Sequence, residues 1–290
     1  MVNWNIWKGC CEFNEFCANC KVIKKGLTKF DVQIDDFDLP IHTKGIGELE
    51  LKYHSYTIFN VCPLSDFFLE NTDASREKYW NIMRLRHDCL FVICTKRVER
   101  LAERMPKEPL NNVAIVLSIS TQKELDYALA KEIPQSIKHL WVSVTPMKEE
   151  VSLAKLSNAK VDNISRIEYV YSGGDLFGET VTDFAWHSAL AQECHDREIG
   201  YTFQSTGTLF KIGEKVYTIP KDKQSEQATK ANINVSKEVP IKELEGTPLV
   251  KGGFIWRVIN NILVPLDENT REIKYDLLNQ TQSIINYGKF

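Results

Sequence analysis

The chain has 290 residues, of which 43% are hydrophobic, so it is long and apolar enough to bury a sizeable core. Its 36 Lys and Arg residues against 39 Asp and Glu residues give a net charge of −3, which argues against a general polyanion-binding protein and leaves only a local basic groove open. The apolar runs have the length of strands, and residues 1–9 lack the basic and apolar segments of an export signal. We therefore expect a cytoplasmic protein with no membrane partner.

From residue 56 onward, short β-branched segments alternate with amphipathic ones. The expected strands are 56–61, 89–95, 112–120, 139–146, 166–174 and 200–207, with residues 3–6 as a candidate first strand. The expected helices are 76–85, 97–105, 122–133 and 183–199. Alternation of strand and helix at this spacing indicates βαβ units and a parallel sheet. The sequence thus predicts an α/β fold, either a complete or partial (β/α) barrel or an open doubly wound sheet.

The C-terminal part of the chain has a different pattern. Residues 221–239 are polar and are expected to form a surface helix or linker after a barrel domain of residues 1–220. In residues 252–266 the apolar positions surround Asn260 and Asn261, a pair typical of a two-residue hairpin turn. We expect residues 240–290 to form a small C-terminal β-containing extension, which serves either as a lid over the strand ends or as a stabilising flap.

Polar residues follow the apolar strands directly. They are Ser65 and Asp66, Lys96 and Arg97, Ser118, Thr145, Asp175 and Gln204. In both α/β architectures the carboxyl edge of the sheet carries the chemistry, so this pattern predicts a polar pocket above a packed sheet. Arg97 itself is expected to be solvated at a helix start close to that pocket.

Four of the eight cysteines lie close to the N-terminus, in a segment without apolar periodicity. Cys10, Cys17 and Cys20 have C-x6-C-x2-C spacing, which can direct three thiolates at one site. A structural zinc site needs a fourth ligand, and no second CxxC or HxxxH pair follows. An iron–sulfur cluster held by three thiolates leaves one iron open, and a redox pair would use only two cysteines. The spacing alone leaves these three alternatives open, with Cys11 expected to be a bystander.

The remaining cysteines and two histidines are expected to have structural roles. Cys62, Cys89, Cys94 and Cys194 lie singly in apolar segments and are expected to be packed thiols. His187 and His195 are expected at the surface or at its boundary.

The segment WNIWKGCCEFNEFCANC resembles the opening motif of the three-Cys-motif, phage-associated proteins of unknown function, a family related to radical S-adenosylmethionine (SAM) enzymes. The resemblance covers residues 4–235 and continues in order through NVCPLSDFF, VICTKRVERL, LSISTQ, SVTPM, SGGD and YTFQSTG. The chain is also remotely similar to spore photoproduct lyase, whose barrel carries a Thr-Lys after one strand and a Ser after the next. Lys96 and Ser118 occupy the matching positions.

The resemblance implies a (β/α) barrel of radical SAM type with a 4Fe–4S cluster on Cys10, Cys17 and Cys20 and SAM on the open iron. The reduced cluster would cleave SAM to methionine and a 5′-deoxyadenosyl radical, which abstracts a hydrogen from the substrate. An electron donor of flavodoxin or ferredoxin type is implied, and the substrate is left open among a nucleotide, a nucleic acid, a peptide and a small metabolite. The alternative is a non-catalytic iron–sulfur or zinc-binding accessory module that acts with a partner protein.

The resemblance also assigns roles to single residues. Lys96 is expected to pair with the SAM carboxylate, Asp66 to receive its ammonium group, and Ser118 to bond to the ribose or carboxylate. The candidate catalytic residues are Asp66, Lys96 and Asp175. The candidate cofactor-binding residues are Asn19, Ser65, Asp66, Lys96, Ser118 and Gly174. The chain departs from the family pattern at Asn19, Lys21, Thr145 and Asp175, which leaves the cysteines intact and the substrate in doubt.

Overall fold

The computed structural model describes residues 2–12, 15–28, 39–42, 57–86, 89–157 and 160–237, and four later strands within residues 255–286. Within these ranges, the helices are all too short or too polar to cross a lipid bilayer.

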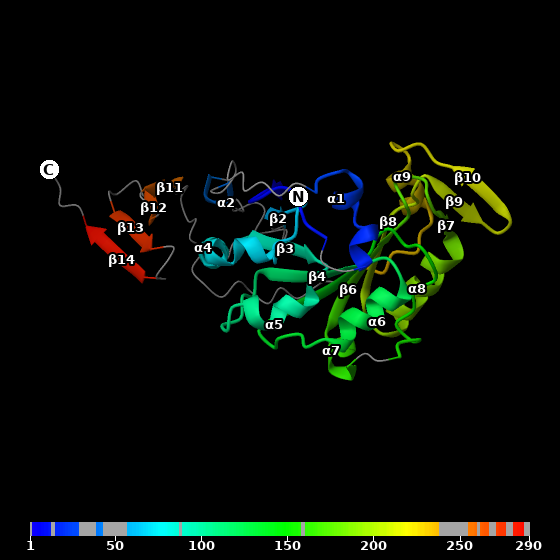
Figure 1. The fold of residues 1–290 in the computed structure, drawn as a ribbon, viewed down its shortest axis with the longest axis horizontal. Coiled ribbons are helices and arrows are strands. Elements are labelled where there is room, and N and C mark those ends of the chain that lie inside the picture. The colour runs from blue at the N-terminus through cyan, green and yellow to red at the C-terminus, as the bar shows by residue number, and fades with distance from the viewer. Residues whose placement is uncertain are drawn as a thin grey trace.

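A seven-stranded parallel sheet forms the centre of the molecule and curls into a half-barrel (Figure 1). Its strands, in spatial order, are β1 (Val2–Trp4), β2 (Thr57–Val61), β3 (Cys89–Thr95), β4 (Val113–Ile119), β5 (His139–Val144), β6 (Ile167–Gly173) and β8 (Gly200–Ser205). All seven expected strands are confirmed, and β1 and β8 are the two edges of this sheet. The fold is therefore a mixed α/β half-barrel, which agrees with the partial barrel among the expected architectures.

A helix follows each of the strands β2 to β6, as βαβ units require. These helices are α4 (Asp73–Leu85), α5 (Leu101–Arg104), α6 (Gln122–Ala130), α7 (Val161–Ser165) and α8 (Phe184–Asp196), of which α5 to α8 lie on one side of the sheet (Figure 1). Thr121 begins α6 by accepting a hydrogen bond from the backbone of Glu124, and Asp183 begins α8 in the same way with Ala185. The expected helix 97–105 is shorter, because Val98–Arg100 form a 3₁₀ turn before α5.

Alternation along the strands gives the sheet two apolar faces. Phe91 and Ile93 of β3 belong to the main core that packs against the helices. Leu90 and Val92 point to the other face, where they meet Val116 and a smaller aromatic cluster. That cluster contains Trp141, Tyr169 and Tyr171, whose ring centroids lie 4.8–6.0 Å apart. The helices cover the outer face, while the inner face has this apolar patch beside polar residues near the strand ends, such as Ser118 and Ser143.

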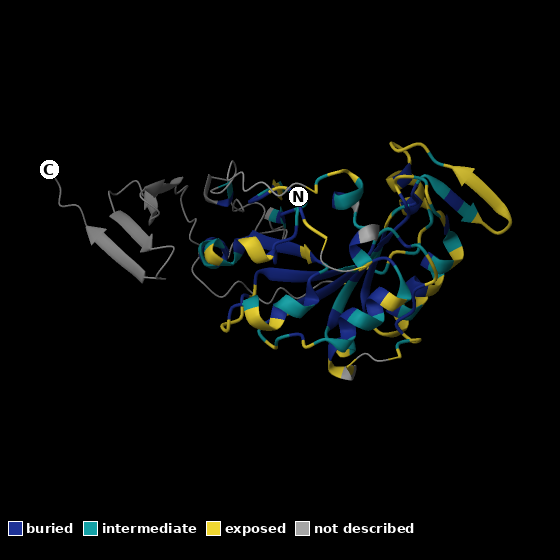
Figure 2. Cartoon of the chain, in the orientation of Figure 1, coloured by how far each residue is buried: buried dark blue, intermediate teal, exposed yellow. Residues whose placement is uncertain are grey.

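A second, three-stranded sheet was not expected from the sequence. Its order is β10 (Lys215–Thr218), β9 (Leu209–Ile212) and β7 (Val181–Asp183), and α9 (Gln224–Lys230) follows it. Figure 2 shows β10 exposed along its whole length. After α9, an antiparallel bridge between Val235 and Tyr201 covers the edge of β8.

The C-terminal strands form a separate antiparallel sheet. They are β11 (Ile255–Ile259), β12 (Ile262–Leu266), β13 (Arg271–Asp276) and β14 (Thr281–Asn286). Ile259 pairs with Ile262, so the chain reverses as the hairpin prediction requires, although residues 260 and 261 lie outside the described residues. The sheet lies beside α2 (Leu39–His42), at the opposite end of the molecule from β9 and β10 (Figure 1).

Candidate functional site

A cavity of about 340 Å³ at the ends of the strands contains all three motif cysteines, Cys10, Cys17 and Cys20. Four other expected site residues line the same cavity, namely Ser65, Asp66, Lys96 and Ser118. The remaining polar and aromatic lining comes from Asn60, Cys94, Thr95, Arg97, Ser143, Thr145, Tyr171 and Gln204. Its volume falls within the range of about 300–1,000 Å³ typical of small-molecule sites. The cavity lies where the sequence predicted a pocket, above the packed sheet.

Trp7 anchors the cysteine segment on the side of β2. Trp7 is fully buried, stacks on Phe67 and donates its indole N–H to the backbone oxygen of Asp66 at 2.9 Å. Gly9 follows with φ +83°, a left-handed conformation that glycine adopts without strain. The hydroxyl of Ser65 donates to the Gly9 carbonyl at 2.5 Å, so Ser65 ties the cysteine segment to the loop after β2.

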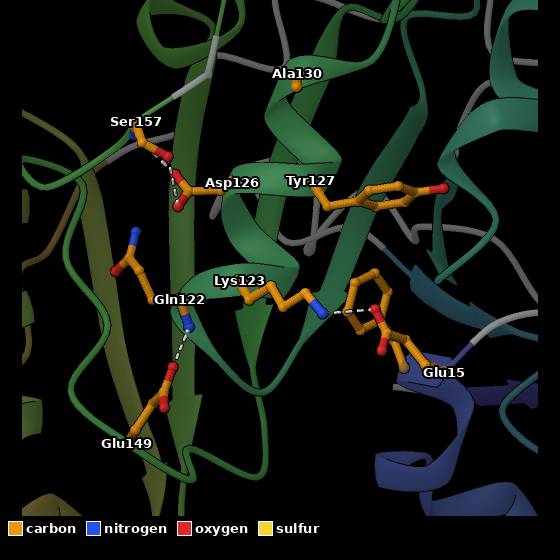
Figure 3. Close-up of a pocket in the computed structure, with 9 residues that line it drawn as sticks. Glu15, Gln122, Lys123, Asp126, Tyr127, Ala130, Glu149 and Ser157 are labelled. Atoms are coloured by element: carbon orange, nitrogen blue, oxygen red, sulfur yellow. Dashed lines mark hydrogen bonds and ion pairs between the residues drawn. The ribbon is translucent and has the colours of Figure 1, made fainter.

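Helix α6 holds the other side of the cysteine segment (Figure 3). The Phe16 ring lies 5.1 Å from the Tyr127 ring, edge to face, and Glu15 pairs with Lys123 at 2.7 Å. The residues that make these contacts line an outer groove of about 690 Å³. Other polar groups of the groove bond to one another, since the Asp126 carboxylate accepts hydrogen bonds from Ser157. The groove is therefore where the 3₁₀ turn Glu15–Asn19 docks on α6, through the two residues that precede Cys17.

The three motif cysteines are free thiols, with Cys10 and Cys17 buried and Cys20 half-buried. Burial, with a smaller contribution from nearby Asp66, raises the pKa of Cys10 to about 12, while Arg97 acts in the opposite direction. A thiol in this state ionises when it binds a metal, because metal binding releases its proton.

The spacing leaves two metal centres open, a zinc ion and an iron–sulfur cluster. In the described part of the chain, no three Cys, His, Asp or Glu side chains are gathered around one point as ligands of a single ion would be. Each thiolate of an iron–sulfur cluster binds a different iron, so the cysteines surround a volume and not one point. Cys10, Cys17 and Cys20 line one cavity, and their three soft sulfur donors match such a cluster in type.

Asp66 connects the loops that follow β2 and β3. Its carboxylate accepts hydrogen bonds from the Thr95 hydroxyl at 2.9 Å, the Lys96 backbone at 3.1 Å and the Phe68 backbone at 2.9 Å. The carboxylate thus fixes the backbone from which Lys96 projects. This set of partners accounts for the burial of Asp66 without a ligand.

Lys96 pairs with a carboxylate that sequence reasoning missed. Its Nζ lies 2.6 Å from Glu124 Oε2 and 3.1 Å from the Ser118 carbonyl oxygen. Both side chains are largely buried, at 10% and 2% exposure. The Thr-x-x-Glu pattern of Thr121 and Glu124 is a capping-box signature, and it gives no sign that the Glu124 carboxylate also pairs with Lys96.

Residues 2–248 match a family that is described as "Protein of unknown function (DUF5131)". The chain belongs to the DUF5131 family. The matched range contains the whole half-barrel and every residue that lines the cavity, so the candidate site lies inside the DUF5131 region. No curated protein and no solved structure matches the chain.

Two expected site residues of this DUF5131 chain do not line the cavity. The Asp175 carboxylate accepts hydrogen bonds from the backbones of Phe177, Glu179 and Thr180 at 2.9–3.1 Å, so it shapes the loop after β6. Gly174 allows a close backbone approach, but its neighbour is protein, since an added Cβ would lie 2.1 Å from the Thr206 carbonyl oxygen. Asn19 ends the 3₁₀ turn, and its side chain lies outside the described residues.

Three expectations about single side chains were wrong. Arg97 is not solvated but buried, and it lines the cavity. Cys94 is exposed toward the cavity instead of packed, because it lies on the inner face of β3, while Cys62, Cys89 and Cys194 are buried as expected. His187 is fully buried beneath β6 and β8, where its Nδ1 bonds to the Ser172 hydroxyl at 2.8 Å. His195 is exposed, as expected.

Proposed function

We propose that this DUF5131 protein is a radical SAM enzyme. The observation that carries the proposal is that Cys10, Cys17 and Cys20 line the same cavity as Lys96 and Ser118, at the strand ends of an α/β half-barrel. These residues come from distant parts of the sequence, and the resemblance to radical SAM proteins assigns them to one cofactor site. Their shared cavity supports that assignment.

When bound, a reduced 4Fe–4S cluster on the three cysteines supplies the electron that cleaves SAM to methionine and a 5′-deoxyadenosyl radical. The residues of the chain bind and orient the cofactors and exclude competing reactions. The proposal includes an electron donor of flavodoxin or ferredoxin type.

Lys96 is the residue that we assign to the SAM carboxylate. An ammonium group has three N–H donors, and Glu124 and the Ser118 carbonyl oxygen take two of them. We assign the third N–H donor of Lys96 to the SAM carboxylate in the cavity. Asp66 acts as a positioning residue in place of the ammonium-binding role expected from the sequence, since its carboxylate already holds the backbone of Lys96.

Anaerobic reconstitution with iron and sulfide tests the proposal. We expect a brown protein with about four irons and four sulfides per chain, from which dithionite and SAM release 5′-deoxyadenosine. Replacement of Cys10, Cys17 or Cys20 by Ala should remove iron, sulfide and colour, whereas Cys11→Ala should retain them. A protein that binds the cluster and never cleaves SAM would support the accessory-module alternative.

A further inference from the structure

Arg97 is a buried cation that contacts the cysteine segment. Its side chain is 1% exposed and lines the cavity. Nη2 donates to the backbone oxygen of Cys11 at 3.0 Å and lies 3.3 Å from the Cys11 sulfur. This contact joins the loop after β3 to the N-terminal segment, 86 residues earlier in the chain.

The position of Arg97 is fixed from two further directions. Its backbone N–H donates to the Thr95 hydroxyl at 2.9 Å, and that hydroxyl is bound to Asp66. Its Nε lies 3.6 Å from a carboxylate oxygen of Glu70. Arg100, one helical turn later, also lies near Glu70, at 3.9 Å, and pairs with Asp73, but it does not line the cavity.

A fixed positive charge beside a thiolate-bound cluster has a definite electrostatic consequence. A cluster held by three thiolates becomes more negative by one charge when it is reduced. A nearby cation stabilises the more negative state to a greater extent, and this effect is stronger in a buried site than in water. Net charge and hydrogen bonds near the sulfurs are among the factors that set the potential of iron–sulfur clusters.

We propose that Arg97 is a positioning residue for the cluster, with two effects: it holds the cysteine segment through the Cys11 carbonyl, and its charge makes the cluster easier to reduce. This inference rests on the proposed function, because it concerns the same site. The two effects can be measured separately, since only the second requires the cluster.

The test compares wild type with Arg97→Gln, Arg97→Lys and the matched control Arg100→Gln. Hydrogen–deuterium exchange of the metal-free proteins reports how firmly residues 10–12 are held. We expect faster exchange there in both Arg97 variants, because neither Gln nor Lys reproduces the guanidinium fork, and wild-type exchange in Arg100→Gln. Unchanged protection in the two Arg97 variants would overturn the positioning role.

A redox titration followed by electron paramagnetic resonance reports the second effect in the reconstituted proteins. We expect Arg97→Gln to disfavour reduction by about tenfold, which is about 59 mV for a one-electron couple, and Arg97→Lys to stay close to wild type because it keeps the charge. If Arg97→Gln takes up no iron, the reduction potential of Arg97→Lys is the deciding measurement. Because Arg97→Lys keeps the charge, a tenfold shift of its reduction equilibrium would overturn the charge effect. An equal shift in Arg100→Gln would also overturn it. A wild type that binds no iron would refute the proposed function, and the exchange experiment would still decide the positioning role.

Discussion

The ammonium group of Lys96 lies 2.6 Å from the carboxylate of Glu124. Lys96 lines the cavity, Glu124 lies next to it, and both side chains have little exposure to water. Loss of one partner from a buried ion pair leaves an uncompensated charge, which typically costs about 3–5 kcal/mol. Any substitution of Lys96 therefore affects the stability of the fold as well as the ligand.

We expect Lys96→Met to lower the free energy of unfolding by about 3 kcal/mol, measured by denaturant titration. Adding Glu124→Gln should restore most of this loss, because the unpaired carboxylate is removed as well. SAM binding to the reconstituted protein should fall by at least about tenfold in both the single and the double variant. Wild-type SAM affinity in the stable double variant would show that Lys96 does not hold the cofactor.

Gly174 should tolerate no side chain. An added Cβ would lie 2.1 Å from the Thr206 carbonyl oxygen, so Gly174→Ala must move the backbone of the neighbouring strand end. Gly173→Ala is the matched control, since its Cβ would lie 3.3 Å from the flexible end of Thr145. We expect Gly174→Ala to destabilise the fold by about 2–3 kcal/mol more than Gly173→Ala, in thermal or denaturant unfolding. Equal effects of the two substitutions would show that this close approach is not needed.

The buried imidazole of His187 should make the fold sensitive to acid. Burial lowers the pKa of His187 to about 3, far below the value of 6.5 that is usual for histidine. Between these values the unfolded chain binds a proton that the folded protein does not, so stability is full above about pH 6.5 and falls as the pH decreases. The slope should be about 1.4 kcal/mol per pH unit.

His187→Phe should remove this slope while it keeps a ring against Phe203, although the variant loses the hydrogen bond to Ser172. The difference in unfolding free energy between wild type and variant should therefore shrink from pH 6.5 toward pH 4. The exposed His195 provides the control, and His195→Phe should leave the pH profile unchanged. A difference that stays constant with pH would mean that His187 is not neutral in the folded protein.

Six of the seven strands of the half-barrel could be predicted because each is an apolar run followed by polar residues, whereas β1 has only three residues and was a candidate from its place before the cysteines. The convergence of Cys10, Lys96 and Ser118 follows from the rule that parallel strands end at one edge. The three-stranded sheet could not be predicted, since β7 has three residues and β10 is exposed along its length, which leaves no period of apolar residues to detect.

The burial of Arg97 and His187 depends on partners distant in sequence. Arg97 is covered by a segment that lies 86 residues earlier, and His187 by Ser172 and Tyr201 on two different strands. From the local sequence, Arg97 resembles an ordinary residue at a helix start and His187 an ordinary surface residue. Asp175 followed a strand as an active-site acid does, and only the three backbone amides that it binds identify it as a loop-forming residue.

The most direct measurement is the release of 5′-deoxyadenosine from SAM by the reconstituted protein with dithionite, in parallel with Cys17→Ala and Cys11→Ala. Cys17 lines the cavity and Cys11 does not, so the two variants differ at the proposed site while each removes one thiol from the same segment. We expect release by wild type and by Cys11→Ala and none by Cys17→Ala. Release that survives Cys17→Ala, or a wild type with four irons that leaves SAM intact, would contradict the assignment as a radical SAM enzyme.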